Sequence, residues 1–179
     1  DVKSVIESID AKTIYDVPLL MLEEKLDKVV LKKLKIKSII KADLSSWKKF
    51  VHNLKNPKNE VNIGLIGKYV ELQDSYKSIL ESFIHAGSVN SVTVNVLPID
   101  SESIDKTNVK SLMSALDGVL VAPGFGERGI EGKIMSIEYA RVNDIPFLGI
   151  CLGMQMAVIE YARNIIGLKN ANSTEMDSH

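Results

Sequence analysis

The sequence has a single cysteine, few aromatic residues and no long apolar run. One cysteine excludes an internal disulfide framework and fits a reducing cytoplasm. No apolar stretch approaches the roughly 20 residues that a membrane-spanning helix requires. The formal net charge of −1 lacks the strong positive excess of proteins that bind nucleic acids regardless of sequence. We therefore expect a cytoplasmic protein with neither a nucleic acid nor a membrane as its partner.

The composition is otherwise that of a soluble globular protein. Hydrophobic residues make up 45% and charged residues 25% of the 179 residues, and this length suffices for one domain and an appendage. The first residues, Asp1 to Ser4, start without methionine and form no signal peptide. We expect them to lie inside a longer polypeptide.

The first 60 residues show helical patterns followed by a break. From Pro18 to Leu34, apolar residues recur at spacings of three and four while charged residues occupy the other face, which predicts helical structure. Asp43 is placed to cap a second helix. The apolar stripe of that helix is formed by Leu44, Trp47, Val51 and Leu54. Because residues 56–60 are polar and turn-forming, we expect a helical appendage over residues 1–42, then a linker helix and linker over residues 43–60.

Beyond residue 60, short apolar runs alternate with helical stretches. Strands are expected over residues 61–66, 92–97, 118–122 and 146–150. Helices are expected over residues 75–86, 109–116, 132–142 and 152–165. This alternation implies crossover connections, and so an α/β fold with a doubly wound, mostly parallel sheet over residues 61–179. Ligands bind at the carboxyl ends of the strands in such sheets.

One of these strand ends carries the cysteine. Gly149-Ile150-Cys151-Leu152-Gly153 joins an expected strand to an expected helix, in the Gly-x-nucleophile-x-Gly pattern of a nucleophile elbow. The turn places the sulfur at a helix N-terminus, whose partial positive charge favours the thiolate. The N–H of Leu152 then points to the place where a tetrahedral oxyanion forms. The alternative is a buried cysteine that only packs in a tight turn.

A second glycine-rich loop leaves another strand end. Residues 121–129 contain three glycines, and Gly124 is placed to direct its N–H toward the same oxyanion. The alternative is a flexible loop whose glycines serve only for turning.

These segments together resemble the CTP synthase family. The nucleophile motif of residues 149–155 has the form that this family uses among class I glutamine amidotransferases. Four further segments match in family order: residues 13–18 at the end of the synthetase domain, 64–78 at the start of the glutaminase domain, 124–132 at the oxyanion loop and lid, and 170–175 after the nucleophile helix. The resemblance implies a flavodoxin-like amidotransferase fold in residues 61–179.

The resemblance also implies an activity. Enzymes of this family hydrolyse glutamine at one site and pass the ammonia to another, where ATP activates UTP and CTP forms. They require Mg²⁺ with ATP, are activated by GTP and assemble as homotetramers. The ATP, UTP and metal sites are expected outside this segment, and no metal ligand is expected within it.

Site residues follow from the matched motifs. The resemblance implies that Cys151 is the nucleophile and that the N–H groups of Gly124 and Leu152 form the oxyanion hole. The glutamine-binding residues are expected to be Gly124, Phe125, Leu152, Gln155 and Glu175, with Glu175 pairing with the ammonium group. The region associated with GTP or other nucleotide binding contains Lys68, Arg128, Gly129 and Glu131. Asp10 is placed near the adenine of ATP.

The sequence departs from the family in one respect that matters. The His-x-Glu motif that supplies the base is absent, and His52, His85 and His179 match nothing in the family pattern. The position of His85 near a helix end is explained by a favourable dipole contact. Without a base we expect this segment alone to be inactive. A smaller departure is Ala122-Pro123, where many members carry Pro-Gly.

Two other functions stay open. A DJ-1-like reactive-cysteine protein has the same kind of elbow, but it needs an acidic residue close to the cysteine and has no amidotransferase tail. The match over residues 172–175 and the 60-residue appendage favour the amidotransferase. The other alternative is a non-catalytic module that kept the fold and lost its base.

Overall fold

A four-stranded parallel sheet forms the centre of the carboxyl-terminal part of the molecule. The computed structural model describes residues 4–38 and 40–176. The strands are β1 (Asn59–Gly67), β2 (Val92–Asp100), β3 (Gly118–Val121) and β4 (Phe147–Gly149), in the order β2-β1-β3-β4. Every neighbouring pair is parallel. The expected α/β fold with a doubly wound parallel sheet is therefore confirmed.

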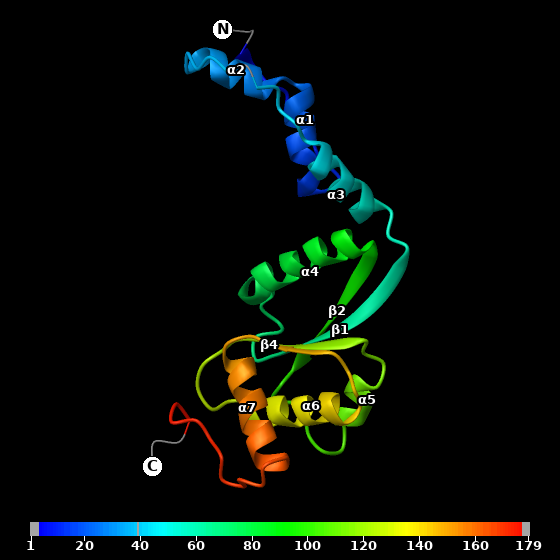
Figure 1. The fold of residues 1–179 in the computed structure, drawn as a ribbon, viewed down its shortest axis with the longest axis vertical. Coiled ribbons are helices and arrows are strands. Elements are labelled where there is room, and N and C mark those ends of the chain that lie inside the picture. Colours follow the sequence, from blue (N-terminus) through cyan, green and yellow to red (C-terminus); the bar gives the residue numbers. More distant parts are fainter. Residues whose placement is uncertain (1–3, 39, 177–179) are drawn as a thin grey trace.

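Helices cover both faces of this sheet, because alternate residues of each strand point to opposite sides. On one face, Leu65 and Leu120 pack under α4 (Lys77–Asn90), which follows the short 3₁₀ helix η3 (Gln73–Tyr76). On the other, Ile66 and Val121 pack against the remaining helices (Figure 1). These helices are α5 (Val109–Met113), α6 (Ile130–Val142) and α7 (Leu152–Asn164).

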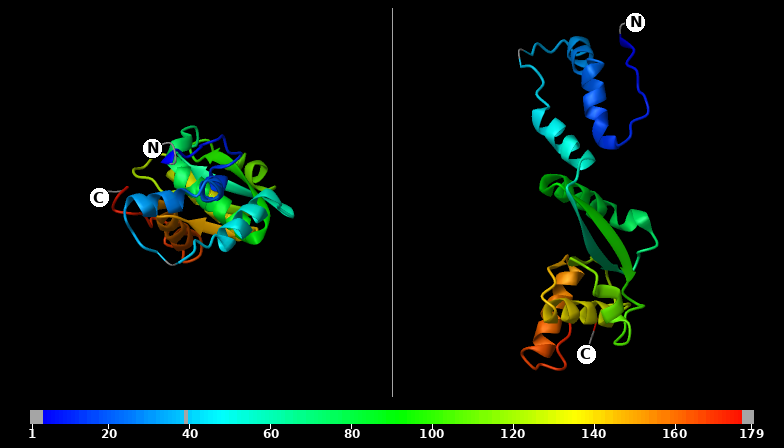
Figure 2. Two further views of the ribbon diagram at one scale, coloured as in Figure 1. Left: turned by 90° about the horizontal axis from the view of Figure 1, so that it is seen from above. Right: turned by 90° about the vertical axis from the view of Figure 1, so that its right-hand side faces the viewer.

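The amino-terminal residues form a separate helical unit at one end of an elongated molecule (Figures 1 and 2). Its elements are η2 (Ile14–Asp16), α1 (Val17–Glu23), α2 (Leu26–Lys33) and α3 (Ser45–Lys55). The helical pattern from Pro18 to Leu34 is interrupted at Lys25, whose φ of 60° is left-handed. Leu44 and not Asp43 is the N-cap residue of α3, although Oδ1 of Asp43 accepts a hydrogen bond from the N–H of Ser45 at 2.9 Å. The expected linker ends early, because β1 begins at Asn59.

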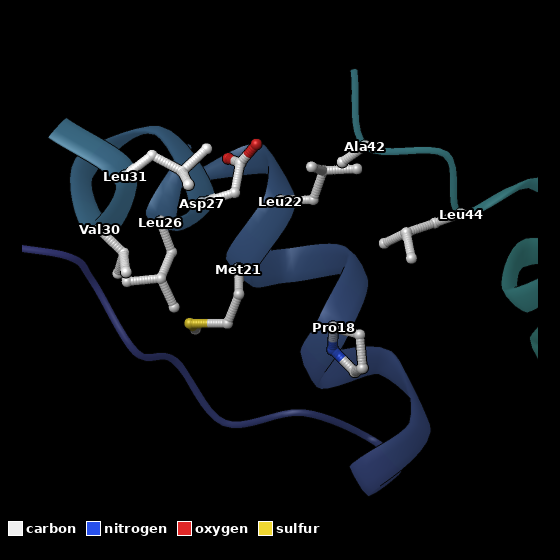
Figure 3. A pocket seen from close by; sticks show the side chains of 9 residues that line it. All are labelled: Pro18, Met21, Leu22, Leu26, Asp27, Val30, Leu31, Ala42 and Leu44. Carbon is white, nitrogen blue, oxygen red and sulfur yellow. The ribbon is translucent and has the colours of Figure 1, made fainter. Parts of the chain in front are cut away.

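This unit has an open apolar groove between α1, α2 and the segment that precedes α3 (Figure 3). The groove encloses about 490 Å³. Its lining is formed by Pro18, Met21, Leu22, Leu26, Asp27, Val30, Leu31, Ala42 and Leu44. Val5, Ile14 and Leu34 expose more than half of their surface elsewhere in the unit. Its own residues therefore bury little apolar surface.

A polar and aromatic cluster joins the helical unit to α4. Tyr15 donates a hydrogen bond from its hydroxyl to Glu81, and the same oxygen lies 2.9 Å from Nε2 of His85. Trp47 donates from Nε1 to the carbonyl of Tyr15 at 2.9 Å, and Phe50 packs edge-on against the Tyr15 ring. Burial, followed by the hydrogen bond to Glu81, raises the pKa of Tyr15 to about 12. The helix-dipole explanation of His85 was wrong: α4 continues to Asn90, and His85 lies within it against Tyr15.

Replacing Tyr15 with phenylalanine tests this junction. The ring packing is kept and the hydroxyl is lost, so we expect the free energy of unfolding to fall by about 1 kcal/mol. Urea unfolding followed by tryptophan fluorescence measures it, because Trp47 contacts Tyr15. The control is Tyr161→Phe, at a tyrosine that is 51% exposed. Equal midpoints for the two variants would show that the hydroxyl contributes nothing.

Candidate active site

The turn from β4 into α7 holds Cys151 in a strained backbone conformation. Cys151 precedes the first residue of α7 with φ of 51° and ψ of −107°, a region that side chains other than glycine rarely adopt. The turn is anchored on β3, since the N–H of Ile150 donates to the carbonyl of Val121 at 3.1 Å. Cys151 is an exposed free cysteine. The alternative of a buried cysteine that only packs is therefore excluded.

The two glycines of the elbow are required by close backbone contacts. A Cβ on Gly153 would lie 2.2 Å from the carbonyl oxygen of Val121. A Cβ on Gly149 would lie 2.6 Å from the backbone of Gly153 and Met154. Neither glycine has a positive φ. Their role is thus to let α7 start directly against β3 and β4.

The glycine-rich loop after β3 lies beside this elbow. A Cβ on Gly124 would be 3.4 Å from Cδ2 of Leu152, which is an ordinary contact. Within residues 4–38 and 40–176, the N–H groups of Gly124 and Leu152 have no hydrogen-bond acceptor. The positive φ angles of the loop occur at Gly126 and Gly129, both 71°, and not at Gly124. Gly124 therefore does not depend on glycine's conformational freedom.

Two buried lysines hold the carbonyl groups of the same loop. Lys68, at the end of β1, is 6% exposed, and its Nζ donates to the carbonyls of Phe125 and Gly126, each at 2.7 Å. Lys133, in the first turn of α6, is 0% exposed, and its Nζ donates to the carbonyl of Ala122 at 3.0 Å. Burial and the charge of Lys68 lower the pKa of Lys133 to about 8, against the raising effect of Cys151. Burial likewise lowers the pKa of Lys68.

Sequence reasoning missed Lys133, although a signal was present. Lys133 interrupts an apolar helical stripe formed by Ile130, Ile134 and Ile137, all of which are buried. A lysine on the buried face of a helix is rare unless its ammonium group has partners.

The residues expected to bind glutamine differ in their burial and in their position relative to the elbow. Gln155 lies one turn beyond Cys151, to whose carbonyl its N–H donates at 3.1 Å. Its side-chain oxygen is buried and has no hydrogen-bond partner among the described residues. Glu175 is exposed, and its charge acts on Lys68, which places it on the same side of the molecule. Phe125 is 81% exposed, so its ring does not line a closed pocket.

Comparison with known proteins assigns this arrangement to a family. A model of the class-I glutamine amidotransferases matches residues 71–178. The chain belongs to this family. It is 66% identical to a CTP synthase of Christiangramia forsetii, over 98% of this chain and 32% of that protein. A CTP synthase of Methanocaldococcus jannaschii is 54% identical, over 100% of this chain and 34% of that protein.

A solved structure supports the same conclusion. The glutaminase domain of Trypanosoma brucei CTPS with bound acivicin is 40% identical, with a TM-score of 0.61, over 66% of this chain and 47% of that chain. The resemblance to the CTP synthase family is therefore confirmed, and the amidotransferase is favoured over the DJ-1-like alternative. The chain spans about a third of the length of the curated CTP synthases that it matches.

The residues expected near a nucleotide lie in different places. Arg128 pairs with Glu102 at 2.7 Å and lies over the Tyr69 ring, 5.4 Å from its centroid. Gly129 precedes the first residue of α6, and Glu131 pairs with Arg163 at 3.0 Å. Asp10 is exposed and precedes η2 in the sequence, and the helical unit that contains η2 lies at the opposite end of the molecule from α7 (Figure 1). The structure thus brings Lys68 and Arg128 together and leaves Asp10 apart.

Neither of the two histidines among the described residues lies in the elbow or in the loop that follows β3. His85 lies against Tyr15, and His52 is on α3. His179 lies outside the described residues. Over residues 4–38 and 40–176, no group of three or more His, Cys, Asp or Glu side chains is arranged to hold a metal ion. The helices in those ranges are all too short or too polar to span a membrane.

Proposed function

We propose that this chain is the glutamine-hydrolysing part of a CTP synthase, which provides ammonia for the conversion of UTP to CTP. The observation that carries the proposal is the exposed Cys151 on a strained strand-to-helix turn, followed by the N–H of Leu152 and with the loop of Gly124 beside it, both N–H groups having no acceptor in the part of the chain that the structure describes. Relatives named CTP synthase are 53–66% identical over nearly all of this chain.

The chemistry follows from the elbow. The Cys151 thiolate bonds to the side-chain amide carbon of glutamine, and the amide oxygen becomes an oxyanion. The N–H groups of Gly124 and Leu152 stabilise this oxyanion by donating hydrogen bonds that strengthen as the charge develops. The carbon–nitrogen bond then breaks, ammonia leaves with a proton from the base, and a glutamyl thioester remains. Water hydrolyses the thioester to glutamate and regenerates Cys151.

Recognition of glutamine is assigned to the side chains around the elbow. Gln155, whose side-chain oxygen is buried and has no hydrogen-bond partner among the described residues, is assigned to hold the substrate through its side-chain amide. Glu175 pairs with the α-ammonium group, and Phe125 closes over the substrate once it is bound. The base that takes the thiol proton is a histidine held by a glutamate, and we place both in the longer polypeptide outside the described residues. This segment alone is accordingly inactive.

The same proposal includes the nucleotides, the metal ion and the oligomeric state of the whole protein. ATP with Mg²⁺ and UTP bind outside this segment, with Asp10 near the adenine of ATP. GTP acts as an activator at the region of Lys68, Arg128, Gly129 and Glu131. The protein is a cytoplasmic homotetramer.

The test uses the longer protein that contains this chain. CTP formation is measured with glutamine or with ammonia as the nitrogen donor, before and after treatment with acivicin, the glutamine analogue bound in the T. brucei domain. Treatment should remove the glutamine-dependent activity, spare the ammonia-dependent activity and leave a mass adduct on the peptide that contains Cys151. Excess glutamine should protect that peptide. Equal loss of both activities, or an adduct elsewhere, would refute the proposal.

A further inference from the structure

Lys133 is a fully buried charge close to the nucleophile. Its side chain, 0% exposed, extends from the first turn of α6 beneath the loop that follows β3. Its Nζ donates to the carbonyl of Ala122 and lies 3.7 Å from the position of a Cβ on Gly124. Lys133 contacts the backbone on which the oxyanion hole depends, and the elbow chemistry described above makes no use of it.

The contacts of the two lysines fix the loop on both sides of Gly124. Lys133 holds the carbonyl that precedes Pro123, and Lys68 holds the carbonyls of Phe125 and Gly126. Because each peptide unit is planar, holding a carbonyl oxygen also fixes the orientation of its peptide plane. The peptide that carries the N–H of Gly124 lies between these fixed planes. The two lysines therefore restrict the directions that this N–H can take.

The buried charge of Lys133 is not explained by a contribution to the stability of the fold. Among the described residues, Lys133 forms no ion pair, and its ammonium group donates to one neutral carbonyl. Burying an unpaired ammonium group is unfavourable, and an apolar side chain of the same size would fill the space at lower cost. Cys151 acts to raise the pKa of Lys133, while burial and the charge of Lys68 lower it.

We propose that Lys133 is a positioning residue for glutamine hydrolysis: it holds the Ala122 carbonyl so that the Gly124 N–H faces the oxyanion, and it places a positive charge near the reacting thiolate. This inference rests on the proposed function. It assigns to α6 a part in catalysis without any contact to the substrate.

The test is Lys133→Met in the longer protein, because methionine keeps the volume and removes the charge and the donor. We expect kcat/KM for glutamine at pH 7 to fall at least 10-fold, and ammonia-dependent CTP formation to stay within two-fold. The matched control is Ile137→Val, on the same buried face of α6, for which both activities should stay within two-fold.

A pH series separates this role from a structural one. Since the pKa of Lys133 is lowered to about 8, its charge is present at pH 7 and is lost as the pH rises through 8. The ratio of wild-type to Lys133→Met activity with glutamine should therefore decline above pH 8 and stay above 1 above pH 9, because the neutral amine still donates to the Ala122 carbonyl but no longer places a charge near the thiolate. A constant ratio, or a variant within two-fold of wild type at pH 7, would overturn the inference. A wild type that uses ammonia but not glutamine would instead refute the proposed function, and this inference with it.

Discussion

Replacing Cys151 with alanine should lower glutamine-dependent CTP formation by ~10⁴-fold or more, because removal of a nucleophile leaves only the catalysis that binding and the oxyanion hole provide. Ammonia-dependent CTP formation should be unchanged, since it needs no thioester. Alanine is compatible with the space at this exposed position. Steady-state rates of the longer protein with each nitrogen donor measure the effect.

The control for this variant is Met154→Ala. Met154 lies in the same first turn of α7 and is 55% exposed, so its loss should leave both activities within a few-fold of wild type. A Cys151→Ala enzyme that still uses glutamine at more than about a hundredth of the wild-type rate would contradict the assignment of the nucleophile.

The elbow could be predicted from sequence because its signals are local. A short apolar run, two glycines around a cysteine and a following helical stripe are all adjacent in the chain, and each reflects a steric need that the structure shows at Gly149 and Gly153. The parallel sheet was predicted for a related reason. Its strands are short runs separated by helices, and only a crossover topology accommodates them.

The role of Lys133 could not be predicted in the same way, because its burial depends on a contact across the fold. Lys133 reaches the end of β3 only once α6 has packed on the sheet. The partnership of Tyr15 with Glu81 and His85 likewise joins residues that are about 70 positions apart. The interruption at Lys25 could not be predicted for a different reason. The apolar spacing continues through this residue, although its backbone adopts the left-handed conformation.

The second large effect is expected for Gly153→Ala, which should destabilise the protein even though alanine favours helix formation over glycine. Alanine in place of a helical glycine normally stabilises a helix by about 1 kcal/mol. Here the added Cβ would lie 2.2 Å from the carbonyl oxygen and 2.9 Å from the carbonyl carbon of Val121. Both atoms belong to the backbone of a central strand, so α7 must shift as a unit.

We therefore expect Gly153→Ala to lower the free energy of unfolding by about 3 kcal/mol, the upper end of the usual cost of overpacking. Glutamine-dependent activity should fall with it, because a displaced α7 moves Cys151 and the N–H of Leu152 away from Gly124. Thermal unfolding of the longer protein, with both activity assays, measures these effects. The matched control is Gly124→Ala, whose Cβ meets its nearest atom at 3.4 Å and which should unfold within about 0.5 kcal/mol of wild type. If Gly153→Ala were as stable as Gly124→Ala, the close approach of α7 to β3 would not be what requires glycine in the elbow.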